Sequence, residues 1–401
     1  MNSKITLPHN HIKPSQRMSH IQPYFFKAQD ELIAKLVSSG KEIIRLDVGS
    51  PDLPPTPCII EALISQVTLP DQHGYMPHGG TKALREAICQ YYFNRFNVSL
   101  NPQTEVLAVL GSKEGLFHLS QAYLEAGDIS LVPDPGYPVY ANSSLIAGAS
   151  VYAFPLLLQN NYLPDLAQIS KNVLKNAKML WLNYPNNPTG ATASLDFFEQ
   201  AVHFCHSHQI LLVHDAAYAD VYYDGYHPPS IFQIPGAKET AIEFASLSKT
   251  YNMAGWRIGM AVGNECNIAA LSNYKSQADS STFAPIMYAA KVALISDQSW
   301  IQKRNLVYQK RRDTAVKLLS ESGLALSSPK AAIYLWAKVP ENYPNSADFC
   351  HHVLENIGVS LTPGIVYGAY GEGYFRIALT VKDELFEKGI CRLAEFIKTK
   401  P

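Results

Sequence analysis

Residues 246–259 read SLSKTYNMAGWRIG and combine one lysine, one arginine and two serines in a short stretch. An amine that bonds covalently to a carbonyl must be held rigidly with its charge suppressed, and Lys249 has the fixed cation Arg257 nearby. The hydroxyls of Ser246 and Ser248 can donate to an anion. This combination favours a phosphate-bearing aldehyde, pyridoxal phosphate. The alternative is a solvated loop lysine beside a surface arginine, because single motif matches carry a false-positive risk.

An acidic residue ends a predicted strand upstream of this stretch. Residues 209–215 read QILLVHD, a pattern typical of a buried parallel strand with its polar group at the carboxyl end. Ligands of open α/β sheets bind at that edge. Asp215 could keep a ring nitrogen protonated there, and Tyr218 could reach a ring hydroxyl. His214 either supports this acid from behind or is a plain structural histidine.

Two further predicted strands lead into segments suited to hold such a ligand. The strand at 179–183 runs into a proline-rich loop that restrains Asn187 towards an extended conformation. The strand at 106–110 leads into a glycine-opened helix start at Ser112 and Lys113. Free amides at such a helix start are typical of a phosphate cradle.

These stretches resemble fold-type I pyridoxal-phosphate aminotransferases of the class I/II group, and within that group the LL-diaminopimelate aminotransferases and their relatives. The resemblance runs from about residue 23 to the C-terminus. Further motifs that carry it are LDVGSPD at 46–52, YMPHGG at 75–80, DPGYP at 134–138 and GEGYFRI at 371–377. One motif alone would be weak, but the whole set occurs in the order of the family.

The predicted fold class is α/β. Apolar strands alternate with helical stretches from about residue 49 to 296, which is typical of a mostly parallel sheet with covering helices. The resemblance implies a fold-type I transferase with a seven-stranded, mostly parallel sheet in a large domain plus a smaller α+β domain. We expect an N-terminal arm and helix at 1–45 that packs with the small domain. The large cofactor-binding domain would span 46–296 and the small C-terminal domain 297–401.

The resemblance assigns roles to the residues that match its motifs. Lys249 would anchor the cofactor covalently and, once freed, carry the proton from the substrate Cα. Asp215 would pair with the protonated ring nitrogen, while Tyr218 and Asn187 would hydrogen-bond the ring oxygen. Tyr137 would stack on the ring, although a core tyrosine in a Pro-Gly turn is the alternative.

Other positions would hold the phosphate and the substrate. The phosphate donors implied by the family are Arg257, Ser246, Ser248 and the amides of Ser112 and Lys113, with Tyr75 reaching the phosphate of a neighbouring subunit in a homodimer. Arg376 would bind the substrate α-carboxylate through two parallel hydrogen bonds, assisted by the backbone of Gly49 and by Asn187. The alternative for Arg376 is a surface ion pair, but its apolar neighbours favour burial.

The predicted function is transamination between an L-amino acid and a 2-oxo acid, 2-oxoglutarate above all, with LL-diaminopimelate as the leading donor. Aspartate, alanine or another amino acid is the alternative, because several positions depart from the diaminopimelate enzymes. Ser50 replaces an acid there, and Gln277, Ser281, Ala284 and Met287 replace Asn, Gly and two Gln. A β-lyase or decarboxylase also stays open, since geometry decides which Cα bond breaks. A sensor built on this fold would carry an added DNA-binding domain, for which the chain has no spare length.

Composition argues against some partners. A formal net charge of −1 gives no electrostatic case for nucleic acid or an acidic membrane surface. No apolar run is long enough to span a bilayer, and the polar N-terminal residues lack the apolar centre of a signal peptide. Six scattered cysteines suggest reduced thiols in the cytoplasm. The histidine- and cysteine-rich run at 203–208 has no second ligand cluster, so we expect no metal site.

Overall fold

The computed structural model describes residues 12–21 and 25–399, and a seven-stranded sheet is its largest element. The strands follow the order β2-β8-β7-β6-β5-β3-β4. Their bounds are β2 (Val106–Val109), β3 (Ile129–Asp134), β4 (Ser150–Pro155), β5 (Ala177–Asn183), β6 (Leu211–Asp215), β7 (Ala241–Ser246) and β8 (Gly259–Gly263). Neighbouring strands are parallel except at β8, which is antiparallel to both β2 and β7. The prediction of a seven-stranded, mostly parallel sheet is therefore confirmed.

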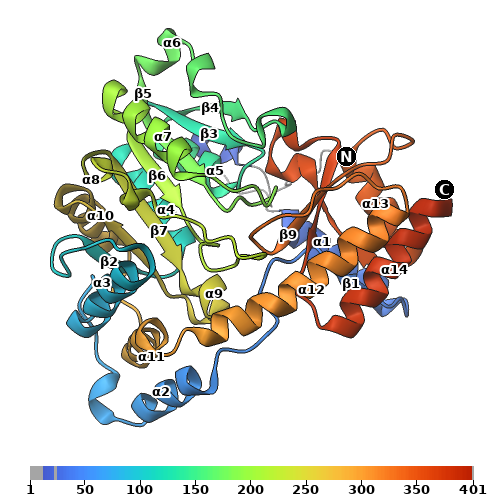
Figure 1. The fold of residues 1–401 in the computed structure, drawn as a ribbon. Helices are drawn as coiled ribbons and strands as arrows, with labels where there is room; N and C mark the ends of the chain where they lie inside the picture. The colour runs from blue at the N-terminus through green and yellow to red at the C-terminus, as the bar shows by residue number, and fades with distance from the viewer. Residues whose placement is uncertain (1–11, 22–24, 400–401) are drawn as a thin grey trace.

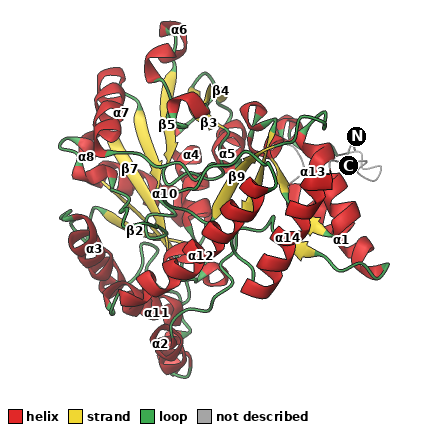
Figure 2. Cartoon of the chain, turned by 45° about the vertical axis from the view of Figure 1, so that its right-hand side comes forward, coloured by secondary structure: helices red, strands yellow, loops and turns green. Residues whose placement is uncertain are grey.

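Helices cover both faces of this sheet (Figures 1 and 2). One face carries α3 (Lys82–Phe96), α7 (Leu195–His208) and α11 (Ala284–Ile295), and the other carries α4 (Ser112–Tyr123), α5 (Val139–Ala147) and α10 (Glu265–Ala278). Shorter or peripheral helices are α2 (Pro57–Val67), α6 (Lys171–Leu174), α8 (Ala237–Thr240) and α9 (Leu247–Thr250). With both faces covered, the central strands are buried throughout, which explains their continuous apolar runs.

A smaller unit is built from the C-terminal third of the chain together with a strand near the N-terminus. It contains α1 (Phe25–Ser38), β1 (Ile44–Arg45), α12 (Ser299–Glu321), β9 (Tyr334–Lys338), α13 (Ser346–Ile357), β10 (Val359–Ser360), β11 (Thr362–Pro363), β12 (Tyr374–Ala378) and α14 (Asp383–Thr399). Strands β11, β12 and β9 form an antiparallel sheet, and β1 pairs with β10 in parallel. The domain ranges 1–45, 46–296 and 297–401 stay a prediction, and residues 1–11, 22–24 and 400–401 of these ranges lie outside the described residues.

The two units share apolar contacts. Ala217, Tyr218, Val221 and Tyr223 follow β6 of the large sheet, yet they pack into the core of the smaller unit. Helix α12 runs from beside α9 across to the smaller unit (Figure 1). It ends before Gly323, whose φ of +91° is a conformation that glycine adopts without steric cost.

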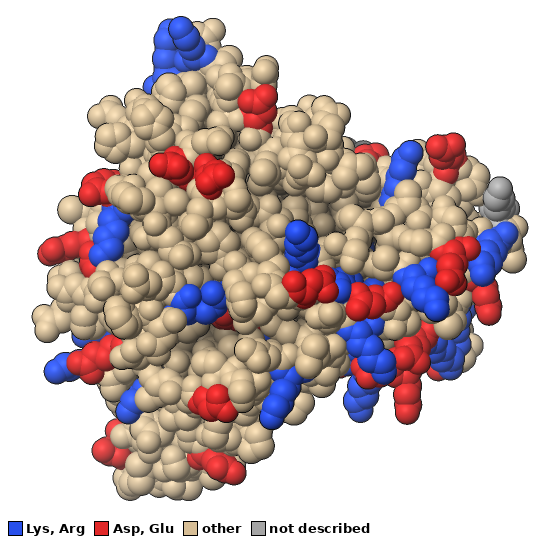
Figure 3. All heavy atoms as spheres, in the orientation of Figure 1, with Lys and Arg blue, Asp and Glu red and all other residues tan. Residues whose placement is uncertain are grey.

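Short 3-10 helices connect several elements. Their bounds are η1 (Gln16–His20), η2 (Pro70–Gln72), η3 (Leu158–Asn160), η4 (Leu166–Gln168), η5 (Ile231–Gln233), η6 (Ala254–Trp256), η7 (Gly364–Tyr367) and η8 (Ala369–Gly371). No helix in the described part of the chain is long and apolar enough to cross a membrane. On the face shown in Figure 3, basic and acidic side chains are interspersed. All six cysteines are free thiols.

Candidate active site

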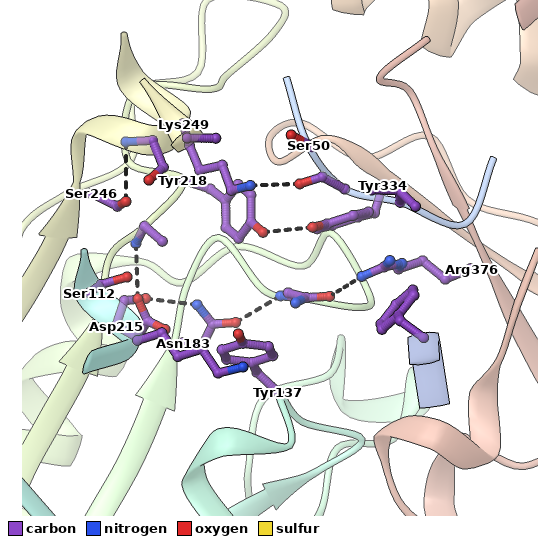
Figure 4. A pocket seen from close by; sticks show the side chains of 18 of the residues that line it. Ser50, Ser112, Tyr137, Asn183, Asp215, Tyr218, Ser246, Lys249, Tyr334 and Arg376 are labelled. Atoms are coloured by element: carbon purple, nitrogen blue, oxygen red, sulfur yellow. Dashed lines mark hydrogen bonds between the residues drawn. The ribbon is translucent and has the colours of Figure 1, made fainter. Parts of the chain in front are cut away.

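A cavity of about 440 Å³ lies between the carboxyl edge of the large sheet and the smaller unit (Figure 4). The predicted site residues that line it are Gly49, Ser112, Lys113, Tyr137, Asn187, Asp215, Tyr218, Ser246, Ser248, Lys249, Arg257 and Arg376. Tyr75 does not line this cavity, because its side chain is 91% exposed on the surface. Folding thus brings residues from positions 49 to 376 around one space.

Lys249 lies on α9, the single helical turn that follows β7. Ser246 begins this turn as its N-cap, since its Oγ accepts a hydrogen bond from the Ser248 amide at 3.2 Å. The Lys249 Nζ donates to the Gly49 carbonyl at 2.6 Å. Burial, together with the cations Arg376 and Arg257, lowers the pKa of Lys249 to about 8. A larger share of this amine is therefore neutral near pH 7 than for a solvated lysine, as attack on a carbonyl requires.

Asp215 ends β6 and is buried at the floor of the cavity. Its carboxylate accepts hydrogen bonds from the Tyr140 hydroxyl at 2.8 Å and from the Ala217 amide at 3.3 Å. Burial raises the pKa of Asp215 to about 6, against the Tyr140 hydrogen bond, which lowers it. A cationic ring nitrogen would supply the counter-charge that favours the ionised carboxylate.

The His214 side chain does not contact the carboxylate of its neighbour Asp215. Its Nδ1 lies 2.8 Å from the Glu243 carboxylate and its Nε2 lies 3.0 Å from the Tyr184 carbonyl. Both ring nitrogens thus have partners outside the cavity, which favours the structural interpretation of this histidine. The hydroxyl that contacts Asp215 belongs to Tyr140, a residue that the sequence interpretation missed.

The segment between β2 and α4 has the shape of an anion cradle. Gly111 precedes α4 with φ +85°, and a Cβ there would lie 2.3 Å from Nη2 of Arg257. The Arg257 guanidinium donates to the Leu110 carbonyl at 3.1 Å, so it stands beside the first amides of α4. Those amides have no partner within the helix. Together with the hydroxyls of Ser246 and Ser248, they fit a phosphate group.

Arg376 comes from β12 of the smaller unit and is 3% exposed. Its Nη1 donates to the Asn187 side-chain oxygen at 2.9 Å and its Nη2 to the Asp47 carbonyl at 2.6 Å. Its Nε is buried without a hydrogen-bond partner in the described structure. This buried guanidinium hydrogen-bonds only to neutral oxygens and forms no direct ion pair with a described residue, and a bound carboxylate would provide that partner.

Two further residues that sequence reasoning missed connect these groups. The Tyr334 hydroxyl lies 2.7 Å from the Tyr218 hydroxyl, and the Tyr334 ring lies 4.0 Å below the Arg376 guanidinium. Asn183 donates to the Asp215 carbonyl at 2.7 Å and accepts from the Asn187 amide at 2.8 Å. Asn183 was visible as the polar end of a predicted strand. Tyr334 carried no such signal, because only the tertiary fold brings β9 to the cavity.

The histidine- and cysteine-rich run at 203–208 is not the place where possible metal ligands come together in the structure. His203, His206 and His208 are exposed on α7. In the described ranges, three possible ligand atoms meet at Glu114, His118 and Asp279. The buried Lys275 ammonium contacts both of these carboxylates, so it already supplies the positive charge that a metal ion would bring.

Comparison with known proteins defines the class. The model of the family "Aminotransferase class I and II" matches residues 41–393. An LL-diaminopimelate aminotransferase of Dehalococcoides mccartyi is 48% identical over 385 residues, which is 96% of this chain and 99% of that protein. Another, of Gloeobacter violaceus, is 45% identical over 383 residues, covering 95% and 98% of the two chains. The chain therefore belongs to the class I and II aminotransferases.

Solved structures agree with this assignment. Substrate-bound BacF from Bacillus subtilis superimposes with a TM-score of 0.93 at 36% identity, covering 97% of this chain and 98% of that one. A double mutant of Thermus thermophilus aspartate aminotransferase gives a TM-score of 0.90 at 26% identity, over 96% and 99% of the chains. The protein is a fold-type I aminotransferase that depends on pyridoxal phosphate.

Proposed function

We propose that this aminotransferase moves the α-amino group between LL-diaminopimelate and 2-oxoglutarate, in the cytoplasm and as part of amino-acid biosynthesis. The main support for this reaction is that Lys249, Asp215 and Arg376 line one cavity, where the Nε of Arg376 has no hydrogen-bond partner in the described structure. The choice of donor rests on the names of the relatives that are 45–48% identical over nearly the whole chain. The six free thiols support the cytoplasmic location.

The cofactor supplies an aldehyde and a ring that takes up the electron pair left at the substrate Cα. Asp215 would stabilise a positive charge on the ring nitrogen, because its buried carboxylate favours a cationic partner. Tyr218 and Asn187 would hydrogen-bond the ring oxygen. Arg257, the hydroxyls of Ser246 and Ser248 and the first amides of α4 would bind the phosphate.

Lys249 carries the proton. Its amine with a pKa of about 8 can accept a proton from Cα and return it, which is the range in which acid–base catalysis is efficient near neutral pH. Arg376 orients the substrate by binding the α-carboxylate, assisted by Asn187 and the backbone of Gly49. Arg376 thereby holds the substrate Cα beside the Lys249 amine. This position favours transfer of the Cα proton over loss of the carboxylate or of a side-chain group.

The residues that depart from the diaminopimelate enzymes differ in whether they line the cavity. Ser50 lines the cavity and is exposed to it. Ala284 and Met287 are buried on α11, where Met287 belongs to the apolar core. The Ser281 hydroxyl accepts a hydrogen bond from the Met76 amide at 3.1 Å and so supports the loop that carries Tyr75. Ser50 is therefore the departure with the most direct route to substrate choice.

A donor with a less polar side chain is the second candidate. A neighbouring cavity of about 490 Å³ shares Phe26, Tyr137 and Arg376 with the first and continues towards Val132 and the loop at 365–368. Its mostly apolar lining would accept an uncharged side chain better than the charged far end of diaminopimelate. Aspartate and alanine enter the same test as smaller donors.

We further propose a homodimer in which Tyr75 reaches the phosphate of the partner subunit. Tyr75 is 91% exposed, and other large apolar side chains near it, on α2, α11 and their flanking loops, are exposed as well. These are Ile64, Val67, Leu69, Phe283, Tyr288 and Ile295. An apolar face of this kind is typical of an interface between subunits.

The test of the proposed function is a panel of L-amino acids added one at a time to the cofactor-loaded protein. Each productive donor converts the bound cofactor to its amine form, which the visible absorbance reports, and releases its own 2-oxo acid. LL-diaminopimelate is expected to convert fastest, and 2-oxoglutarate to restore the starting spectrum. Release of pyruvate and ammonia from β-substituted donors, or of CO₂, would instead identify a lyase or decarboxylase.

A further inference from the structure

The short helix that carries Lys249 has a partner on the helix that leads to the smaller unit. Helix α9 is one turn long, so its last carbonyl groups, on Lys249 and Thr250, have no acceptor role inside the helix. Figure 1 shows α9 beside the first turns of α12. The side chain that meets these carbonyls is Arg304 of α12.

Arg304 binds three backbone carbonyls at once. Its Nη1 donates to the Lys249 carbonyl and, at 3.0 Å, to the Thr250 carbonyl. Its Nη2 donates to the Asp220 carbonyl at 2.7 Å, and its Nε to the Asn305 side chain at 3.0 Å. The guanidinium is 2% exposed, so these bonds form without competition from water.

Thr250 is also held from its side chain. Its hydroxyl donates to the Asp220 carboxylate at 3.1 Å. Asp220 is fixed in turn by the Tyr91 hydroxyl at 2.6 Å and by Arg95 at 3.1 Å. The residue after Lys249 is therefore held on one side through its carbonyl and on the other through its hydroxyl.

We propose that Arg304 is a positioning residue for the reaction: by binding the backbone of Lys249 and Thr250 it fixes the point from which the Lys249 amine transfers the proton. The inference rests on the proposed role of Lys249. Arg304 touches neither cavity, and it acts through the backbone of the residue that does. A displacement of a reacting group by 1 Å can cost about 100-fold in rate, so such a support has a measurable effect.

The geometry favours arginine over lysine here. A guanidinium presents five donors in a rigid planar fork, so Arg304 can bind the carbonyls of Lys249, Thr250 and Asp220 from two separate nitrogens, whereas a lysine ammonium is a single point on a flexible stem. Arg304 also acts by geometry rather than by charge, since burial and the cations Arg376 and Arg257 account for the lowered pKa of Lys249.

The first arm of the test compares Arg304→Lys with Arg312→Lys. Arg312 lies on the same helix, is 3% exposed and binds Asp224 and the Pro329 carbonyl, far from Lys249 in the hydrogen-bond network. With the best donor of the amino-acid panel, Arg304→Lys is expected to lower kcat by about 10- to 100-fold while KM stays within about threefold. The deuterium isotope effect for the Cα-labelled donor should rise. Arg312→Lys should lose thermal stability but keep kcat and the isotope effect.

The second arm uses the apo-protein and needs no turnover. Formaldehyde with cyanoborohydride methylates neutral amines, and peptide mass spectrometry gives the extent at Lys249 as a function of pH. The midpoint for Arg304→Met is expected to match the wild type. A higher midpoint would mean that Arg304 acts through its charge, and it would overturn the inference.

The outcomes separate the two proposals. Equal kcat losses in Arg304→Lys and Arg312→Lys would make Arg304 a general stabilising residue and overturn this inference alone. If Lys249→Ala keeps full turnover, the proposed role of Lys249 fails, and the inference about Arg304 fails with it. Loss of kcat at constant KM, with an unchanged midpoint in the apo-protein, supports the assignment.

Discussion

The two sides of the cavity differ in how complete their polar contacts are. On the side of the large sheet, the Asp215 carboxylate and the Ser246 hydroxyl have hydrogen-bond partners within the protein. On the side of the smaller unit, Arg376 is buried with one nitrogen unsatisfied and with only neutral oxygens around the others. The side chains that face the cofactor are thus held in place by protein hydrogen bonds, whereas Arg376 keeps one nitrogen without a partner until a carboxylate binds.

This difference has a physical reason. The cofactor stays bound through many turnovers, so its binding groups can be held rigidly by neighbouring strands and helix starts. The substrate must leave in each cycle, and an unpaired guanidinium provides binding energy that a permanent ion pair would have cancelled.

The largest effect is expected for Lys249→Ala. Removing the covalent anchor and proton carrier should lower kcat by at least about 10⁴-fold, because general acid–base and covalent catalysis are lost together. Thermal unfolding should stay cooperative. Stopped-flow absorbance of the half-reaction measures the loss, with Lys238→Ala as the control for a lysine that pairs with Glu105 outside the cavity.

A smaller loss is expected for Asp215→Asn. The amide cannot balance a charge on the ring nitrogen, so kcat should fall by about 10²- to 10³-fold, the range typical of a lost electrostatic contact in an active site. Cofactor binding should weaken as well. Steady-state kinetics at saturating cofactor measures the first effect, and near-normal kcat would remove Asp215 from the mechanism.

Tyr140→Phe should have a moderate effect through Asp215. Its hydroxyl donates to the carboxylate and favours the ionised form, so its loss raises the pKa of Asp215 further. We expect kcat to fall by roughly tenfold, because a hydrogen bond to a charged group contributes about 1.5–3 kcal/mol and only part acts in the transition state. Tyr184→Phe is the matched control, since its hydroxyl donates to the Tyr162 carbonyl instead. Equal losses in both variants would contradict the role of Tyr140.

The smallest change concerns the pH at which Lys249 reacts in the apo-protein. Because burial and two arginines lower its pKa to about 8, the amine is protonated and unreactive below that pH and neutral above it. Reductive methylation of Lys249 should therefore rise through about pH 8, whereas an exposed lysine does so near about 10.4. A midpoint equal to that of Lys82, which lies on the surface, would contradict the lowered pKa.

The large sheet was predictable because its strands are continuous apolar runs ending in polar residues. The motif positions Asp215, Lys249 and Arg376 followed from the family pattern, and the structure brings all three to one cavity. Tyr140 lies only three residues after Tyr137, at the start of α5, but nothing in the sequence marked its hydroxyl as a partner of Asp215. Tyr334 was not predictable either, because its contact with Tyr218 spans 116 positions and depends on how two units meet.

Substrate choice was less predictable for a similar reason. Among the five departures from the diaminopimelate enzymes, the loss of two amides at Ala284 and Met287 favoured a less polar donor in the sequence, but only Ser50 lines the described cavity. Met287 is buried in the core, and Ser281 supports the Tyr75 loop. Local sequence does not reveal which side of a mostly apolar helix such as α11 faces the core and which side faces outwards.

The central claim is that Arg376 stays unpaired until a substrate carboxylate binds. The most direct test measures kcat/KM for the best donor and for its α-carboxamide, in the wild type, in Arg376→Ala and in the control Arg312→Ala. We predict that the wild type and the control prefer the carboxylate by about 10²- to 10³-fold, since a desolvated charge pair contributes roughly 2–5 kcal/mol. In Arg376→Ala the preference should shrink to less than about tenfold. An undiminished preference in Arg376→Ala would contradict the claim and place the carboxylate elsewhere.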